Sequence, residues 1–571
     1  MTEKRDVTRT LDEIASYLEI DEPNPFKSMA FRKAARAIED LDTGIDELVR
    51  SGEIRRTAGV GKVIAPIVVE LVESGRASYL EELRAKYPPG ILELMRVPGL
   101  GAKKITLLYA ELGIASIDDL ETAAREGRLR SIRGFGEKTA QKVLDSIASM
   151  REHAGQFLLV AALDSAELLL RALRRNLDVA AAVTGSARRR LEVVDRVELV
   201  VATETPEETA EAIRGIALLE GVARDDRAVH GTVRSIPLTV HLTTPDLLPL
   251  TLLFSTGTGE FVDALRRHAT SVGFELTPSA LLRGAARVEV DDEDAIFRRL
   301  ELEPIPPELR ESGAVLERAE IVTDLVDYDS IRGTFHVHST WSDGRNTLRE
   351  MIGAARELGF SYVGISDHSK AAAYAGGLTE DDLEARDAEL DEITAEMPDI
   401  RIFRGTEADI LQDGTIDYDP ETLDRFDFVV ASIHSRFRMN REEMTQRIVR
   451  ALHDPHVTFL GHLTGRLLLS RAPYELDFDA VFRAAAENGV MIEINGSPKR
   501  LDVDWRHLER AMELGVSFSI HPDAHSTAEM ANVIAGTWVA RKGGVPRERV
   551  FNARPLADVE SHLASRRARA R

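Results

Sequence analysis

The N-terminal part of the chain has the hydrophobic spacing of helices. Apolar residues recur three and four positions apart in LDEIASYLEI, and FRKAARAIEDL repeats this spacing beside a basic face. Three Gly-x-Gly turns, at 59–61, 99–101 and 134–136, each follow an apolar position and precede a helix-like stretch. Because a repeated turn marks a repeated structural unit, we expect a helical region over roughly the first 150 residues.

The hydrophobic pattern changes twice further along the chain. From about 156 to 315, strand-like runs such as VELVVAT and SIPLTVHLTT alternate with helical stretches such as PEETAEAIRGI, and the proline-containing segment EPIPPELRESGAV ends this mixed part. After about 331, seven short β-rich runs alternate with amphipathic helices such as TLREMIGAARELG. Strands separated by helices predict either a parallel barrel or an open parallel sheet.

Composition narrows the classes of protein that fit these patterns. A chain of 571 residues is too long for one core, and 43% hydrophobic with 30% charged residues is typical of soluble globular domains. The absence of cysteine excludes disulfides, thiolate metal sites and cysteine nucleophiles, and it fits a reducing cytoplasm. We expect neither a signal peptide nor a membrane span, and we expect a cytoplasmic, nucleoid-associated protein. The net charge of −23 argues against blanket DNA binding but leaves local DNA contacts open.

Candidate metal ligands stand at the ends of the C-terminal β-rich runs. The two side chains of a His-x-His or Asp-x-His pair can bind metal at the same site, because residues i and i+2 of a strand point to the same side. Histidine with carboxylate and without sulfur suits zinc, manganese or iron better than calcium. Any one of these histidines alone is more typical of a structural role, but their recurrence in successive units favours a metal cluster. The candidate ligands are His336, His338, Asp343, His368, Glu407, His434, His462, Asp523 and His525.

The C-terminal motifs HVHSTWSDG, GISDHSK, RGTEADIL, VASIHSRF, LGHLTGR, EINGSPKRLD and HPDAHS resemble the full motif set of the PHP (polymerase and histidinol phosphatase) domain. The resemblance implies a distorted (β/α)7 barrel, a trinuclear site formed by the nine ligands, and metal-assisted phosphoester hydrolysis. It implies Mn²⁺ or Zn²⁺, up to three ions, with Mg²⁺ possible. Asp367 and Asp409 are then expected to orient a histidine. Arg466 and Arg471 are candidate phosphate clamps, with surface salt bridges as the alternative.

The rest of the chain resembles bacterial family X DNA polymerases (PolX), in NPFKSMAFRKAARAIEDL, GSARRRLEVVDRVELVV, FSTG and PIPPELRE. In that family two catalytic metal ions are held by an Asp-x-Asp pair, which here falls on Arg196 and Glu198, and the neighbouring strand LTVHL has no carboxylate. The expected Schiff-base lysine position of the lyase site is Ile67. We therefore predict a palm that acts as a scaffold without polymerase chemistry. The nucleotide-binding positions that persist are Gly185, Ser186, Arg189, Thr256 and Gly257.

The three N-terminal turns resemble helix-hairpin-helix motifs. Their glycines let the backbone approach phosphates, and the N–H groups at a helix start favour anions. Such contacts position DNA without reading its sequence. The alternative is that the turns only pack the helices. The predicted DNA-binding residues are Gly59, Gly61, Lys62, Gly99, Gly101, Lys103, Gly134, Gly136 and Lys138.

These resemblances predict a multidomain α and α/β protein. We expect a helical DNA-binding domain over 1–78, a fingers-like hairpin region over 79–152, a degenerate palm and thumb over 153–315, a linker over 316–332 and a PHP phosphoesterase domain over 333–571. The leading hypothesis is a monomeric DNA-repair nuclease for gapped, nicked or abasic duplex, with 3′-5′ exonuclease, 3′-end-processing or abasic-site activity. The alternatives are an active gap-filling polymerase with an editing domain, a small-molecule phosphatase resembling histidinol phosphatase, and a non-catalytic DNA-end scaffold.

Overall fold

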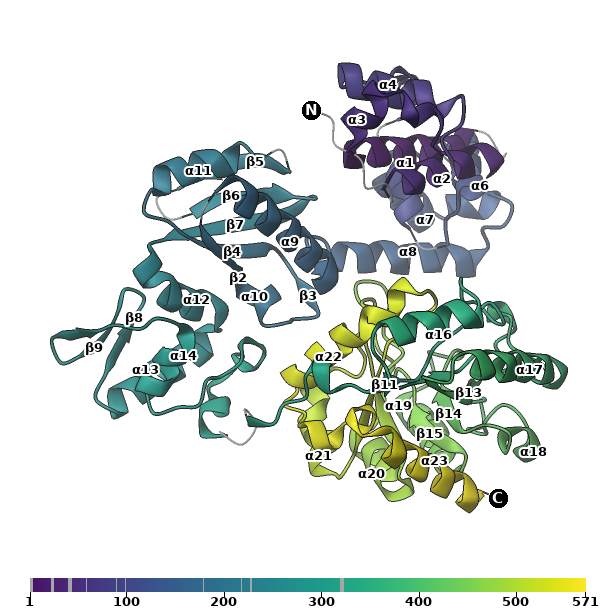
Figure 1. Cartoon of the computed structure of the whole chain (residues 1–571). Helices are drawn as coiled ribbons and strands as arrows, with labels where there is room; N and C mark the ends of the chain where they lie inside the picture. Colours follow the sequence, from purple (N-terminus) through teal and green to yellow (C-terminus); the bar gives the residue numbers. More distant parts are fainter. Residues whose placement is uncertain are drawn as a thin grey trace. The chain divides into compact units, whose positions relative to one another are not determined.

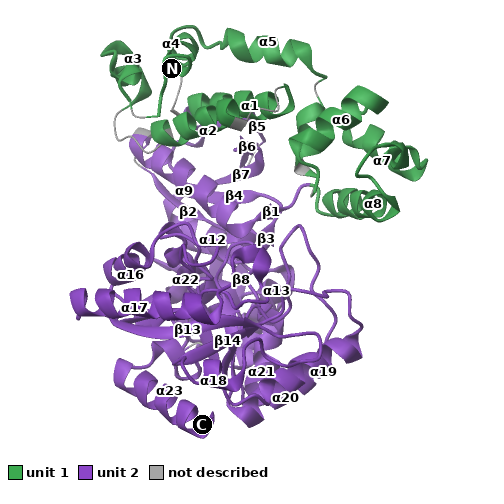
Figure 2. Ribbon diagram, turned by 90° about the vertical axis from the view of Figure 1, so that its right-hand side faces the viewer, with its two compact units in different colours: residues 1–154 green, residues 155–571 purple. Residues whose placement is uncertain are grey.

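The computed structural model describes residues 4–570 except 22–24, 40–43, 58, 89, 98, 178, 217, 226–227 and 319–322. It contains two compact units, Met1–Ala154 and Gly155–Arg571, which Figure 2 colours separately. No helix within these described ranges combines the length and the apolar character that a membrane crossing requires.

The first unit is helical, as its hydrophobic spacing predicts. Its core is formed by one face of each helix, with Leu11, Ile38, Val68, Leu108 and Phe135 almost completely buried. The helices are α1 (Lys4–Asp21), α2 (Pro25–Glu39), α3 (Ile45–Arg50), α4 (Ile64–Ser74), α5 (Ser78–Lys86), α6 (Ala102–Leu112), α7 (Ile117–Arg125) and α8 (Glu137–Glu152) (Figure 1). The second and third Gly-x-Gly turns directly precede α6 and α8, and Lys62 and Val63 separate the first turn from α4.

The second unit begins with a five-stranded sheet in the order β2-β4-β7-β6-β5. Strands β4 and β7 are parallel and the other neighbours are antiparallel. The elements are β1 (Phe157–Leu158), α9 (Leu159–Asn176), β2 (Ala180–Val183), α10 (Gly185–Arg188), β3 (Val193–Val194), β4 (Val197–Ala202), α11 (Pro206–Arg214), β5 (Leu219–Arg224), β6 (Ala228–Val233) and β7 (Ile236–Thr243). This sheet lies within residues 153–315, where a palm and thumb are expected from the sequence.

A smaller lobe follows, with a three-stranded antiparallel sheet in the order β10-β9-β8. Its elements are α12 (Leu248–Thr256), α13 (Gly259–Ser271), β8 (Glu275–Thr277), β9 (Ala280–Arg283), β10 (Ala286–Val288) and α14 (Glu293–Arg299). The buried carboxylate of Glu293 forms ion pairs with Arg310, at 2.5 Å, and with Arg188 of α10. Three charged groups therefore join this lobe to the start of the palm.

The C-terminal part is a nearly closed barrel of seven parallel strands in chain order. The strands are β11 (Gly333–Thr334), β12 (Tyr362–Ile365), β13 (Arg401–Asp409), β14 (Phe428–Ser432), β15 (Val457–Leu460), β16 (Met491–Asn495) and β17 (Phe518–His521). The first and last strands approach each other through a parallel bridge between Val337 and Ala524. Of the two sheet forms that the sequence allows, the barrel is therefore the one observed.

Helices surround this barrel (Figure 1) because its strands are apolar on both faces, as is typical of parallel sheets. They are α16 (Leu348–Glu357), α17 (Glu380–Glu396), α18 (Pro420–Leu423), α19 (Arg441–Leu452), α20 (Phe478–Asn488), α21 (Leu508–Glu513), α22 (Val533–Lys542) and α23 (Leu556–Ala570). A second cluster of buried side chains contains Phe335, Phe428 and Phe459. Gly364 and Gly405 make room for the ring of Phe428, which a Cβ at either position would meet at 2.7 or 2.3 Å.

Candidate metal centre

The structure brings all nine candidate ligands together at the carboxyl ends of the barrel strands. Their imidazole nitrogens and carboxylate oxygens form overlapping groups in which the atoms lie within 4.8 Å of one another. The groups that contain them are His338, Asp343, His368 and His525; His336, His338 and Glu407; His336, His462 and Asp523; and His368, Glu407 and His434.

The bridge between Val337 and Ala524 aligns the His-x-His and Asp-x-His pairs. His338 N donates to Ala524 O at 2.9 Å, and Ala524 N donates to His336 O at 3.3 Å. The regular strand β11 ends at Thr334, so strand alternation alone, which the sequence argument used, does not orient His336. His336 and Asp523 instead have φ of 59° and 51°, a strained conformation for residues other than glycine that costs about 1–3 kcal/mol each. The backbone therefore turns these side chains into the site.

Glu407 of β13 is the central anion of the cluster. Its carboxylate oxygens lie 3.2 Å from His336 Nε2, 3.0 Å from His368 Nδ1, 3.2 Å from His434 Nε2 and 2.9 Å from His462 Nε2. Burial raises the pKa of Glu407. The nearby histidines, His336 and His434 foremost, lower it by more, so that the pKa lies well below its ordinary value. The carboxylate is therefore ionised and belongs to two of the ligand groups.

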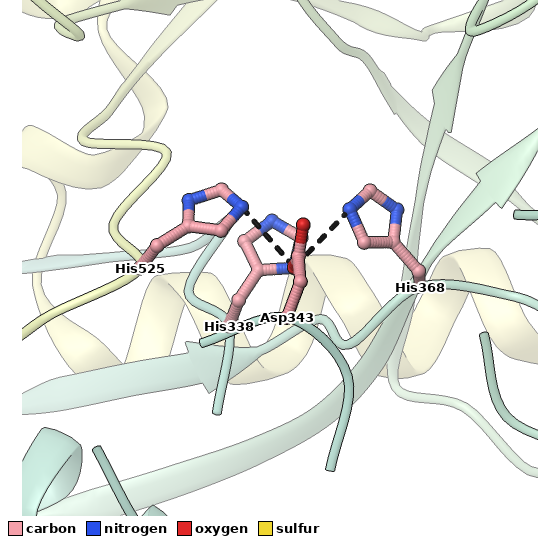
Figure 3. A group of neighbouring side chains, drawn as sticks. All are labelled: His338, Asp343, His368 and His525. Atoms are coloured by element: carbon pink, nitrogen blue, oxygen red, sulfur yellow. Dashed lines mark ion pairs between the residues drawn. The ribbon is translucent and has the colours of Figure 1, made fainter. Parts of the chain in front are cut away.

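Asp343 forms a second focus, nearer to solvent. Figure 3 shows its carboxylate between three imidazoles. Its Oδ1 lies 3.3 Å from His525 Nε2, 3.6 Å from His368 Nε2 and 3.9 Å from His338 Nδ1. The side chain of Asp343 is 38% exposed, whereas those of His338 and His368 are almost fully buried, so Asp343 marks the open edge of the cluster.

The chemistry of the donor atoms fits divalent metal ions. The buried atoms His336 Nε2, both ring nitrogens of His338, His368 Nδ1 and His462 Nδ1 make no hydrogen bond within the described residues. Burial, followed by the neighbouring imidazoles of His525 and His368, lowers the pKa of His338 to about 4, which leaves this ring neutral. Buried ring nitrogens that make no hydrogen bond are costly unless they bind a ligand. Nitrogen and oxygen donors without sulfur suit zinc or manganese.

Sequence reasoning missed Glu493 of β16 as part of this site. Glu493 is fully buried and accepts hydrogen bonds from His336 Nδ1 at 2.8 Å, from the backbone N–H of His462 at 2.7 Å and from Asn495 at 3.0 Å. Burial raises its pKa. The available signal was the i, i+2 pair of polar residues in the otherwise apolar run VMIEING.

The two aspartates expected to orient histidines behave differently. Asp409 does contact a histidine, with its Oδ1 2.6 Å from His434 Nδ1. Burial lowers the pKa of His434, but Glu407 and Asp409 raise it to about 10. Asp367 instead accepts hydrogen bonds from Ser339 N, at 2.8 Å, and from the hydroxyls of Ser339 and Ser342. The expectation that Asp367 orients a histidine is therefore corrected, because its carboxylate fixes the loop between His338 and Asp343.

Arg466 is not available as a phosphate clamp in this structure. Its guanidinium is nearly buried and donates to Arg500 O, to Leu501 O and to Asp504 at 2.6 Å. Arg471 donates to Gly465 O and stacks on a phenylalanine ring, and it forms no ion pair among the described residues.

Arg500, which sequence reasoning did not single out, is the guanidinium beside the cluster. Its Nε lies 3.3 Å from Asp523 Oδ2, and its buried Nη1 makes no hydrogen bond within the described chain. Tyr374, which is 71% exposed, lies at the rim of the same cluster, with its ring centroid 6.4 Å from those of His368 and His434. A guanidinium and an aromatic ring therefore border the candidate metal centre.

The palm positions corresponding to catalytic carboxylates hold no cluster of ligands among the described residues. Arg196 is exposed and pairs with Asp195 at 3.2 Å. Glu198 lies 3.6 Å from His241 Nε2, and its partner on β7 in the strand register is Thr239. A Cβ placed on Gly185 would lie 1.9 Å from Glu198 Oε2, so this carboxylate covers the turn that begins at Gly185.

The basic turn after Gly185 is engaged in contacts within the second unit. Arg189 donates to Thr256 O at 2.6 Å and to Glu311 at 3.0 Å. Lys542 of α22 donates to Arg189 O at 2.9 Å. Ser186 accepts from the backbone N–H of Leu191 through its carbonyl oxygen. Gly257 ends α12 where a Cβ would meet the ring of a phenylalanine at 2.6 Å. The nucleotide-binding positions that the family resemblance implies are therefore in contact with other residues of the second unit.

The N-terminal hairpins have the backbone that their glycines imply. Gly59, Gly99 and Gly134 have φ of 90°, 82° and 90°, values that residues with a side chain rarely adopt. The second glycine of the later two turns precedes α6 and α8 directly. Lys62, Lys103 and Lys138 follow the turns and are exposed.

Comparisons with known proteins match four regions of the chain. Family models match residues 2–77 (helix-hairpin-helix domain), 91–149 (SAM-like helix-hairpin-helix tandem), 251–311 (DNA polymerase beta thumb) and 334–497 (PHP domain). A protein of Bacillus subtilis named DNA polymerase/3′-5′ exonuclease PolX is 34% identical over 98% of this chain and 99% of its own length. Probable phosphatases of Caldicellulosiruptor saccharolyticus and Photobacterium profundum are 27% and 28% identical, each over 38% of this chain and 90% and 87% of their own lengths. The chain therefore belongs to the PolX family, with helix-hairpin-helix, polymerase-beta thumb and PHP domains.

Proposed function

We propose that this chain is a metal-dependent nuclease that hydrolyses phosphoester bonds of DNA at the PHP centre and has lost polymerase activity. The observation that carries the proposal is the convergence of nine ligand residues, Glu407 and Asp343 among them, at the carboxyl ends of the barrel strands. The relative from Bacillus subtilis, whose name includes 3′-5′ exonuclease, supports a reaction at DNA 3′ ends. We further propose that the substrate is gapped, nicked or abasic duplex, and that the chain acts as a monomer in DNA repair.

The residues of the centre have separate tasks. Two or three ions of manganese or zinc, when bound, supply Lewis-acid activation of water and stabilise charge on the phosphate oxygens. Glu493 holds His336 through Nδ1 and leaves Nε2 directed at the cluster. Arg500 has a buried Nη1 without a partner that is suited to donate to a phosphate oxygen. The exposed ring of Tyr374 offers a surface on which a base can stack.

Two other functions have some support. The name of the Bacillus subtilis relative also includes DNA polymerase, and the matched probable phosphatases favour small phosphate esters as substrates. Against polymerisation, neither β4 nor β7 provides a pair of carboxylates at the palm positions, and Glu198 covers the turn at Gly185. Against a small-molecule substrate, the chain matches two helix-hairpin-helix models, and exposed lysines follow the hairpin turns, where they are suited to contact DNA phosphates.

One experiment distinguishes the nuclease, polymerase and phosphatase functions. The full chain is incubated with a gapped duplex, 5′-labelled on the strand whose 3′ end borders the gap, and with small phosphate monoesters, in manganese, zinc or magnesium, with and without nucleotides. We expect shortening of the labelled strand, slower release of phosphate from the monoesters and no primer extension. Phosphate release from the monoesters without any strand shortening would reject the nuclease assignment in favour of a phosphatase.

A further inference from the structure

A basic cleft of about 570 Å³ lies beside the metal centre. It is lined by the loop after β13, the loop after β14 and the exposed side of α19, including Gln412, Arg436, Arg438, Gln446 and Arg450. Its size is within the range of sites that bind small molecules or parts of larger ligands. None of these residues has a role in the centre described above.

The two loops that form the cleft start from the centre itself. β13 ends at Asp409, whose carboxylate contacts His434, and Arg436 follows His434 by two residues. Arg447 of α19 connects the loops, because its guanidinium donates to Leu411 O at 2.8 Å and to Ser435 O at 2.9 Å. The cleft is therefore attached rigidly to the ligands of the metal centre.

The charge of the cleft favours an anionic ligand. Four arginines line it, against the carboxylates of Asp413 and Glu443. Asp413 is occupied by hydrogen bonds from Thr415 N, at 3.1 Å, and from Thr415 Oγ1, at 2.7 Å. Arg436 and Arg450 are exposed and form no ion pair among the described residues, in a chain whose net charge is −23. Arg450 interacts electrostatically with Asp413 without a close ion pair. Exposed guanidinium groups outside close ion pairs match phosphate oxygens in charge and geometry.

We propose that this cleft binds the phosphodiester backbone of the nucleic-acid strand whose terminal nucleotide is at the metal centre. The proposal rests on the proposed nuclease function and adds a binding site for phosphates that are not cleaved. Arginines that contact only phosphates hold the strand without reading its sequence. Longer strands therefore bind more tightly than a single phosphodiester, and the binding weakens with salt.

The test uses the full chain with Arg436→Gln and Arg450→Gln combined. The binding of a fluorescent single-stranded oligonucleotide is measured by anisotropy in EDTA, and hydrolysis of the same oligonucleotide and of bis(p-nitrophenyl) phosphate is measured in manganese. We expect the Kd and KM for the oligonucleotide to rise about tenfold, and the slope of log Kd against log salt to fall by about 0.7 for each lost contact. The kcat for the oligonucleotide and the hydrolysis of bis(p-nitrophenyl) phosphate stay unchanged.

The matched control is Arg349→Gln with Arg356→Gln, which removes the same charge from exposed positions of α16 outside the cleft. An unchanged Kd in the cleft variant, or an equal weakening in the control, would overturn the cleft proposal. The binding measurement does not require hydrolysis. A wild-type chain that binds the oligonucleotide through Arg436 and Arg450 but hydrolyses no DNA would therefore contradict the nuclease function and leave the cleft supported.

Discussion

Glu493 Oε1 lies 2.8 Å from Nδ1 of His336, and this contact leaves Nε2 of the same ring 3.2 Å from Glu407 and 3.4 Å from Asp523. The carboxylate of Glu493 on β16 thus determines which ring nitrogen of His336 faces the metal centre, although the two residues are 157 positions apart in the sequence. Such partners fix the ring orientation of a ligand and raise its basicity.

We therefore expect Glu493→Gln to lower metal affinity without unfolding the barrel. The neutral amide keeps the size of the side chain but no longer supports His336 with a charge, and changes of this type cost about 10–100-fold in affinity. Metal content after dialysis against buffered Mn²⁺ or Zn²⁺, with circular dichroism as the folding check, measures the effect. Glu548→Gln, at an exposed position, is the control. Equal metal content in Glu493→Gln and wild type would contradict the role of Glu493.

Replacement of His338 or Asp523 by alanine should abolish DNA hydrolysis and leave DNA affinity nearly intact. Each belongs to an i, i+2 pair flanking the Val337–Ala524 bridge, so its loss removes or misplaces an ion. Misplacement of reacting groups alone costs about a hundredfold in rate. Nuclease assays and anisotropy on the same gapped duplex measure both effects. Glu198→Ala in the palm is the control. Loss of hydrolysis in that variant would show that the active site is not in the barrel.

The wild-type chain should not extend a primer with any divalent ion. Glu198 faces His241, and Thr239 is its partner on β7, so the palm lacks the carboxylate pair that holds two metal ions. Primer extension on a gapped duplex with Mg²⁺ or Mn²⁺ checks this expectation. Nucleotide incorporation that persists in Asp523→Ala would show that the palm is active.

Combined Lys62→Gln, Lys103→Gln and Lys138→Gln should weaken binding to gapped duplex. These exposed lysines follow the hairpin turns, and each lost phosphate contact lowers the salt slope of log Kd by about 0.9. Hydrolysis of bis(p-nitrophenyl) phosphate should stay the same. Lys86→Gln is the control, since this lysine already pairs with Asp21. An unchanged Kd at every salt concentration would mean that the hairpins only pack the helices.

Glu293→Gln should destabilise the second unit in a pH-dependent way. Burial raises the pKa of Glu293, but Arg310 and Arg188 lower it more, so its pKa in the folded chain is below its ordinary value. The resulting stabilisation is present above the ordinary pKa of about 4.3 and is lost as the pH falls through the lowered value. Removing one partner of a buried ion pair costs about 3–5 kcal/mol.

Thermal unfolding at pH 7 and at pH 3 measures this effect. The difference between Glu293→Gln and wild type should be large at pH 7 and should shrink at pH 3. Asp294→Asn, at an exposed neighbouring position, serves as the control. A difference that is the same at both pH values would show that ionisation of Glu293 does not stabilise the fold.

The sequence by itself determined the elements and most of the chemistry of this protein. The Gly-x-Gly repeats predicted turns that precede helices. The structure adds that Gly59 and Gly134 are left-handed, a conformation that glycine adopts without strain. The alternation of short β-rich runs with amphipathic helices predicted parallel strands, because a helix between two strands allows them to run in the same direction. The nine candidate ligands could be named because they stand at or near the ends of such runs, and the ends of parallel strands meet at one edge.

Only the tertiary structure decided which polar groups act together. The partners Glu493 and His336 are separated by 157 residues, and no local pattern relates them. Asp367 and Arg466 looked like functional residues from their neighbours in the sequence, yet serine hydroxyls and backbone carbonyls take up their polar atoms. The contact of Arg500 with Asp523 likewise follows from no local sequence pattern and is given by the tertiary structure. The physical reason is that periodicity specifies the side of a strand to which a residue points, whereas closure of the barrel specifies what that residue meets there.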